Sequence, residues 1–195
     1  MFAVTNQLAK IVSVTNVSEK HGKERVPALS VGLYLVGSGA MLDQFDSALR
    51  PMLYRKPQPT PGGLPLEYDD NELTELRFPF MRNLAWDRKY AGYLVRFRIG
   101  ASGSEDVLLA ECGLKDIRFV AQEGGSVGIG FKITAHPKDE IDHGKICVRL
   151  QQEIFIDLTP PDTMPTLFDG EDDSTDGERD PFEGSDLAQD ETRID

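Results

Sequence analysis

The stretch from residue 91 to residue 135 constrains the fold most, because its apolar residues recur at every second position. Successive side chains of a β-strand leave opposite faces, so a period of two predicts half-buried strands. The apolar positions are Tyr93, Val95, Phe97, Ile99, Ile117, Phe119, Val127, Ile129, Phe131, Ile133 and Ala135. Turn-forming residues at 100–103, 112–113 and 123–125 separate the runs. The pattern predicts an antiparallel meander with one apolar face and one polar face.

Three more strands are predicted outside this stretch. Residues 8–17 are rich in β-branched side chains, and residues 26–37 alternate, so these two segments predict a hairpin. Residues 145–158 alternate again and predict one long last strand, which the two prolines soon after it bring to an end.

The period of the apolar residues changes between residues 40 and 54. The apolar residues here fall at helical spacing: Met41, Leu42, Phe45, Ala48, Leu49, Met52 and Leu53. This spacing predicts one amphipathic helix with Ser38 as its N-cap. Pro51 is expected to end or kink the helix, because proline lacks the backbone N–H of a helix interior. The apolar stripe is expected to cover an open end or face of the sheet.

Together these patterns predict a mostly β fold. It is either an antiparallel sandwich or a partly open, OB-like barrel, with one short amphipathic helix and a disordered acidic tail. The globular domain is predicted at residues 1–161. Within it, residues 55–72 hold four prolines and no apolar period, which indicates a mobile loop.

The acidic residues of the chain are concentrated at its C-terminal end. Residues 162–195 hold 13 acidic and 2 basic residues, a net charge of −11 out of −12 for the whole chain. This segment has few large apolar residues, so it cannot bury enough surface to offset its chain entropy. We therefore expect a disordered acidic tail.

The remaining composition predicts a cytoplasmic protein that does not cross a membrane. No run of 18 apolar residues is present, and the first residues lack the basic and apolar regions of a signal peptide. Cys112 and Cys147 lie inside apolar strand patterns, which is typical of reduced, buried thiols.

No residue pattern indicates catalysis, a metal or a cofactor. His136 and His143 lie near the acids of residues 139–142, but their spacing matches no metal-binding motif. The glycines of residues 124–130 run into a strand, whereas a phosphate-binding loop leads into the N-terminus of a helix. We therefore expect a protein that is not an enzyme.

The polar face of the predicted meander is rich in cations. If the strands are neighbours, one face carries Arg96, Arg98, Arg118, Lys132 and Arg149, with Trp86, Tyr90 and Tyr34 near them. Cations that meet phosphates, beside aromatic rings that stack on bases, are typical of single-stranded nucleic-acid binding. We assign phosphate contacts to the five cations and base stacking to Trp86 and Tyr90. The alternative is a solvated outer face on which the cations pair with acids.

The acidic tail has two interpretations. As a mobile anion it competes with nucleic acid for the cationic face, while Leu167, Phe168 and Phe182 dock on a replication or recombination protein. Alternatively, the tail only keeps the protein soluble.

Residues 19–35 and 41–54 resemble an uncharacterised group of phage and prophage proteins. The shared features are the KHG…VPA connection of the hairpin and the following MLDQFDSALRPMLY segment, and the likeness covers about residues 8–158. The arrangement of a β-rich body before an acidic tail is similar to phage single-stranded DNA-binding proteins. Their tails generally end in an aromatic residue, whereas this chain ends in Thr-Arg-Ile-Asp.

Two functions are therefore expected. The first is a non-catalytic, single-stranded DNA-binding protein of phage replication or recombination, working in the host cytoplasm. The second is a phage interaction or structural protein, such as a virion component or an inhibitor of a host factor. Cations clustered on one concave face favour the first, and cations dispersed and paired with acids favour the second.

Overall fold

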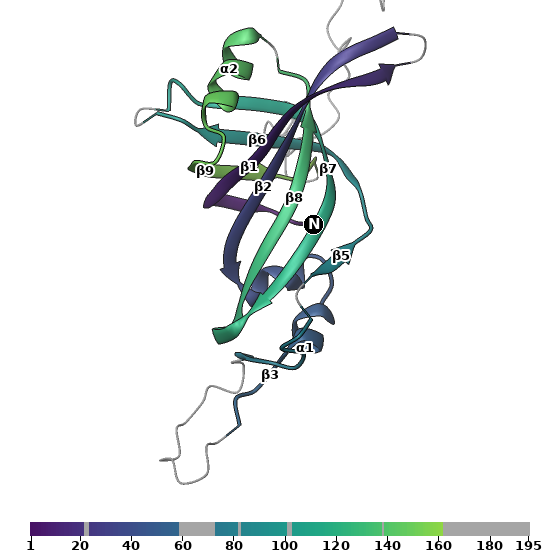
Figure 1. Ribbon diagram of the computed structural model, residues 1–195, viewed down its shortest axis with the longest axis vertical. Helices are drawn as coiled ribbons and strands as arrows, with labels where there is room; N and C mark the ends of the chain where they lie inside the picture. The colour runs from purple at the N-terminus through teal and green to yellow at the C-terminus, as the bar shows by residue number, and fades with distance from the viewer. Residues whose placement is uncertain (22–23, 59–72, 82, 101–102, 138, 162–195) are drawn as a thin grey trace, which may run out of the picture. The chain divides into compact units, whose positions relative to one another are not determined.

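The alternating segments form the wall of a closed antiparallel β-barrel (Figure 1). The computed structural model describes residues 1–21, 24–58, 73–81, 83–100, 103–137 and 139–161. Among these residues, six strands close the barrel: β1 (Val4–His21), β2 (Glu24–Ser38), β8 (Ser126–Ala135), β7 (Val107–Gln122), β6 (Tyr90–Arg98) and β9 (Glu153–Thr159), with β9 returning to β1. A short seventh strand, β5 (Leu84–Trp86), pairs with β7 beyond the end of β6. The barrel form of the predicted β fold is thus confirmed.

The predicted apolar face is the interior of this barrel. All of Tyr93, Val95, Phe97, Ile117, Phe119, Val127, Ile129, Phe131, Ile133 and Ala135 are buried, as are Leu29, Val31, Leu33 and Leu35 of β2. Burial of large apolar side chains is the main favourable term in folding, so the period of two determines which face of each strand turns inward.

The turn predicted at residues 112–113 is wrong, because β7 continues through it as one strand. The irregularities of β7 are instead two residues with left-handed backbone, Glu111 with φ 53° and Asp116 with φ 55°. The register with β8 shifts between Lys115 and Arg118. Such a bulge bends a strand without ending it. The turn predicted at residues 123–125 is confirmed as a 3₁₀ turn, η2 (Glu123–Gly125), between β7 and β8.

The single helix predicted between residues 40 and 54 is two short helices. A 3₁₀ helix, η1 (Gly39–Gln44), begins at Ser38, whose hydroxyl accepts a hydrogen bond from the N–H of Ala40, as predicted. The carboxylate of Asp46 accepts from the N–H of Ala48 at 2.8 Å, which stabilises a turn between the helices. Helix α1 (Leu49–Leu53) then begins, with Pro51 in its first turn, where no N–H is needed. The apolar stripe is nevertheless real, because Leu42, Leu49 and Leu53 are buried.

The long strand predicted at residues 145–158 is wrong in its first half. Residues Glu140–Val148 form helix α2, and β9 begins only at Glu153. Asp139 caps the helix by accepting from the N–H of Asp142 at 2.7 Å, and acids occupy the first turn, where the helix dipole favours them. Of the apolar residues that suggested a strand, Val148 is 74% exposed. Arg149 therefore caps the C-terminus of α2 and does not lie on the barrel wall.

The two ends of the barrel differ (Figure 1). Helix α1 and the two-stranded sheet of β3 (Tyr54–Arg55) and β4 (Glu75–Leu76) lie at one end. At the other end, where α2 lies, β1 and β2 run on as a two-stranded ribbon. The predicted loop at 55–72 begins in β3, but residues 59–72 lie outside the described residues, as does the predicted tail at 162–195. None of the described helices has the length and apolar character needed to span a membrane.

Candidate nucleic-acid interface

One row of outward side chains crosses four neighbouring strands of the barrel. Lys10 on β1 lies opposite Tyr34 on β2, Tyr34 opposite Gly130 on β8, and Gly130 opposite Arg118 on β7. Directly opposite residues of antiparallel strands share a face and lie side by side. The row therefore places an aromatic ring between two cations.

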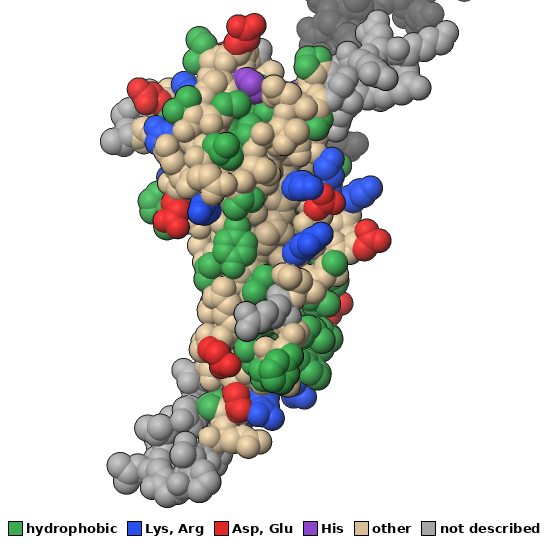
Figure 2. All heavy atoms as spheres, viewed as in Figure 1, with side chains coloured by type: hydrophobic (Ala, Val, Ile, Leu, Met, Phe, Trp, Pro, Cys, Tyr) green, Lys and Arg blue, Asp and Glu red, His purple; other side chains and the backbone are tan. Residues whose placement is uncertain are grey.

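A second row runs beside the first. Ser13 on β1 lies opposite Gly32 on β2, Gly32 opposite Lys132 on β8, and Lys132 opposite Lys115 on β7. The two rows bring together Lys10, Tyr34, Lys115, Arg118 and Lys132, which we call the wall patch. In the space-filling view, Lys and Arg side chains gather over β7 and β8 with acidic side chains among them (Figure 2).

Tyr34 lies against a part of the wall that has no side chains. Its ring covers Gly128 and Gly130 of β8: a Cβ built on Gly128 falls only 2.7 Å from Cζ of Tyr34. The hydroxyl of Tyr34 accepts a hydrogen bond from Nε2 of Gln122 at 3.2 Å. The glycines and the hydrogen bond hold the ring in place, so that it is half-buried beside the cations.

Two hollows adjoin the wall patch. The first, of about 270 Å³, is lined by Tyr34, Ser13, Gly32, Gly130, Asp116, Arg118 and Lys132, among others. The second, of about 190 Å³, is lined by Trp86, Arg88, Lys89, Asp116 and Arg118, among others. Asp116 and Arg118 line both, so the hollows form one surface that extends from β1 to the connection between β5 and β6.

The wall patch carries four cations, and one acid, Asp116, lies among them. Nζ of Lys132 lies 2.8 Å from Oδ2 of Asp116. The hydrogen bond from Lys132, with further help from the charges of Lys115 and Arg118, holds the pKa of Asp116 below its ordinary value. Within the described part of the chain, Lys10, Lys115 and Arg118 make no ion pair within 4 Å. Those three cations can pair with an external anion.

Arg96 and Arg98 do not belong to the wall patch. Both lie on β6, where Arg96 is opposite Leu108 of β7. Leu108 is ten residues from Arg118 along β7, about 30 Å at the rise of a strand. Arg96 pairs with Asp106 at 2.7 Å, and Arg98 donates two hydrogen bonds to Asp157, at 2.9 and 3.0 Å. The predicted common face of cations is therefore divided, and these two guanidinium groups are occupied by acids.

Trp86 and Tyr90 are packing residues in this structure. The indole ring of Trp86 packs against Phe45 and Phe119, with centroids 6.1 Å apart in each case. Its Nε1 donates to the hydroxyl of Tyr90 at 3.1 Å. The guanidinium of Arg88 lies 5.4 Å from the centre of the Tyr90 ring. Both rings already have partners, and the aromatic ring at the centre of the wall patch is Tyr34.

Arg149 lies at the end of α2, away from the wall patch. With Ile99, Glu105, Lys145 and Val148 it lines a separate shallow hollow. The proposed docking residues Leu167, Phe168 and Phe182 lie outside the described residues.

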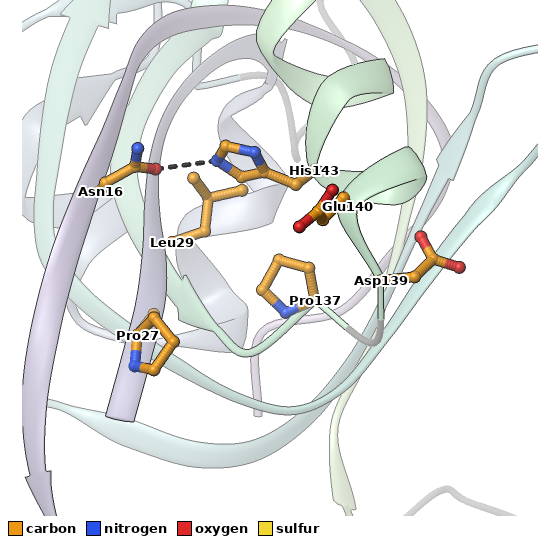
Figure 3. A pocket seen from close by; sticks show the side chains of 8 residues that line it. Asn16, Pro27, Leu29, Pro137, Asp139, Glu140 and His143 are labelled. Atoms are coloured by element: carbon orange, nitrogen blue, oxygen red, sulfur yellow. Dashed lines mark hydrogen bonds between the residues drawn. The ribbon is translucent and has the colours of Figure 1, made fainter. Parts of the chain in front are cut away.

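A larger hollow, of about 410 Å³, lies between the ribbon and the start of α2 (Figure 3). Pro27, Leu29 and Pro137 supply apolar walls, and Glu140 and His143 extend toward it from α2. Nε2 of His143 is 2.8 Å from Oδ1 of Asn16.

The imidazole of His143 also has a thiol neighbour. The same Nε2 lies 3.6 Å from Sγ of Cys147. A nucleophile–histidine–carboxylate or amide triad uses both ring nitrogens, whereas here both neighbours meet one nitrogen. The described residues also include no group of three or more His, Cys, Asp or Glu side chains able to hold a metal ion.

The fold and its surface define a closed antiparallel β-barrel protein with a cationic patch around an outward tyrosine. No protein-family model matches this chain, and no curated protein or solved structure matches it either. The resemblance to phage proteins stays a prediction, and the functional argument rests on the residues of this chain.

Proposed function

We propose that this protein binds single-stranded nucleic acid on the wall patch, as a non-catalytic protein of phage DNA replication or recombination. The observation that carries the proposal is Tyr34, whose ring lies over Gly128 and Gly130 in the row between Lys10 and Arg118. Phosphates bind the cations, and an unpaired base stacks on the ring. Such stacking contributes about 1–3 kcal/mol for each base. A base inside a duplex cannot reach the ring, so the proposal is for single strands.

The acidic tail is proposed to act as a competitor for the same patch. Its net charge of −11 is opposite to that of the wall patch. A tethered anion has a high effective concentration, so it lowers the apparent affinity for nucleic acid. Strands that bind several cations at once displace it.

The test is fluorescence anisotropy with a labelled oligothymidine of about 16 nucleotides. Wild-type protein is compared with Tyr34→Leu, Tyr34→Phe and a chain that ends at residue 161. The leucine variant should bind at least several-fold more weakly than wild type. The phenylalanine variant, which keeps the ring but loses the hydrogen bond from Gln122, should bind more tightly than the leucine variant, and the truncated chain should bind more tightly than wild type. Arg149→Gln is the matched control, because Arg149 is a cation outside the wall patch. Absence of binding by every form at low salt contradicts the proposal.

A second candidate is a phage interaction or structural protein. The observation that favours it is that Arg96, Arg98 and Lys132 are each paired with an acid. In addition, Ile141 and Val148 of α2 are 68% and 74% exposed, and Val148 lines the hollow that also contains Arg149. Such a surface suits an apolar segment of a protein partner. This candidate gains support if oligonucleotides do not bind and if capture of a protein partner is lost in Ile141→Asp.

A further inference from the structure

Asp116 is an unexpected residue for a phosphate-binding surface. Its carboxylate lies among Lys115, Arg118 and Lys132, where a negative charge repels the phosphates that those cations attract. It also lies at the bulge of β7 with left-handed backbone, φ 55°, a conformation that aspartate and asparagine adopt more readily than most residues.

The ion pair with Lys132 does not account for this arrangement. The side chains of Lys132 and Asp116 are 49% and 50% exposed, and such solvent-exposed pairs stabilise a protein very little. A role in binding explains better why the bulge of β7 presents a carboxylate here.

The position of Asp116 suits recognition of a base. It lines the same hollow as Tyr34, and the Oδ2 that meets Lys132 leaves Oδ1 and further lone pairs for other donors. A base stacked on Tyr34 directs its edge, and not its face, toward the rim of the hollow. Gly32 and Gly130 also line this hollow, with Ser13 lying over Gly32 and the ring of Tyr34 over Gly130.

We propose that Asp116 gives the wall patch a preference for guanine, by accepting hydrogen bonds from the Watson–Crick edge of a base stacked on Tyr34. A carboxylate accepts two parallel donors, and guanine alone among the common bases presents two adjacent donors, N1–H and the N2 amino group. Adenine and cytosine each offer one amino group beside an acceptor. Thymine offers one N–H between two carbonyl oxygens that a carboxylate repels. This inference rests on the proposed nucleic-acid binding and specifies its ligand.

The test compares wild-type protein with Asp116→Asn in anisotropy titrations. The probes are labelled oligonucleotides of about 12 nucleotides, in which thymine alternates with guanine, adenine or cytosine. Asparagine tolerates left-handed backbone well, so this variant keeps the fold. Glu111→Gln is the matched control. Glu111 is an exposed acid on β7 with the same left-handed backbone as Asp116, but it lines neither hollow of the patch.

Wild-type protein should bind the guanine oligonucleotide roughly tenfold more tightly than the other two, as expected for one good base-edge contact. Asp116→Asn should lose this preference and bind the adenine and cytosine oligonucleotides more tightly, because a charge that repels phosphates is gone. Glu111→Gln should keep the preference. Binding without base preference in wild type, or an unchanged preference in Asp116→Asn, overturns the inference and leaves the proposed function standing. Absence of binding to all three oligonucleotides overturns both.

Discussion

The ring of Tyr34 on β2 occupies the space that a side chain at Gly128 on β8 needs. A Cβ at position 128 falls 2.7 Å from Cζ and 3.0 Å from Cε2 of the ring, closer than such atoms approach. Two strands thus cooperate to present one aromatic ring. Tyr34 can take this position only because residue 128 on the neighbouring strand is a glycine.

Substitution of Gly128 by alanine should therefore displace Tyr34. Because the ring is the end of a flexible side chain at the surface, the stability cost should lie at the low end of overpacking costs, about 1 kcal/mol. The affinity for oligothymidine should fall about as far as in Tyr34→Leu. Chemical denaturation and anisotropy measure the two effects. Gly144→Ala on α2 is the control, since a Cβ there meets nothing within 4 Å, and it should leave binding unchanged. Full affinity in Gly128→Ala argues against the role of Tyr34.

The affinity for single strands should depend steeply on salt. Each phosphate that a cation neutralises contributes about −0.7 to the slope of log K against log salt, so contacts by three or four residues of the wall patch predict a slope of about −2 to −3. Arg118→Ser should make the slope shallower by about 0.7. Titrations between about 50 and 200 mM salt measure it. Arg98→Gln should leave the slope unchanged, because Asp157 already holds that guanidinium. A slope near zero means that the cations do not contact phosphates.

Stability should fall in acid, in part through Asp106. Burial alone raises the pKa of Asp106, but hydrogen bonds from Arg96 and from the N–H of Ile99 outweigh it and hold this pKa below the ordinary value. Such a group stabilises the fold above its unfolded pKa of about 3.9, and the contribution is lost as the pH falls through the folded value. The pKa values of Glu75 and Asp116 are lowered as well, with effects of the same sign.

Denaturation curves between neutral pH and about pH 3 check this prediction. Wild-type stability should begin to fall below about pH 5. Asp106→Asn should be less stable at neutral pH and should show a shallower loss in acid. An equally steep loss in the variant shows that other carboxylates govern the acid transition.

The two thiols should differ in reactivity. Burial, together with the charge of Glu111, raises the pKa of Cys112 to about 12, so almost none of its thiolate exists at neutral pH. Cys147 is only half-buried. A thiol reagent should therefore modify no more than one cysteine of the native protein quickly. Cys147→Ser should abolish the fast phase, and denaturation should expose both thiols. Fast modification of Cys112 in the native state contradicts its burial.

The sequence by itself determined most of the strands that form the barrel wall and which face of each turns inward. The period of two at residues 91–99 and 126–135 is a local property, because it requires only that one face of each strand be buried. It also identified Ser38 as a cap, since capping involves only neighbouring residues. It misassigned residues 145–148 to the start of a strand, because Ile146 and Val148 alternate as in a strand. In the structure they end helix α2, which Asp139 caps at its start.

Only the tertiary structure decided which cations lie together. Strand order and register are long-range properties, and a sequence period does not specify which strands are neighbours. The order of the barrel places Arg118 beside Lys132 and Tyr34, and places Arg98 against Asp157 at a distant part of the wall. The same order packs Trp86 against Phe45 and Phe119 and leaves Tyr34 outside. The candidate site thus depends on pairings between residues up to about a hundred positions apart, which only the closed barrel defines.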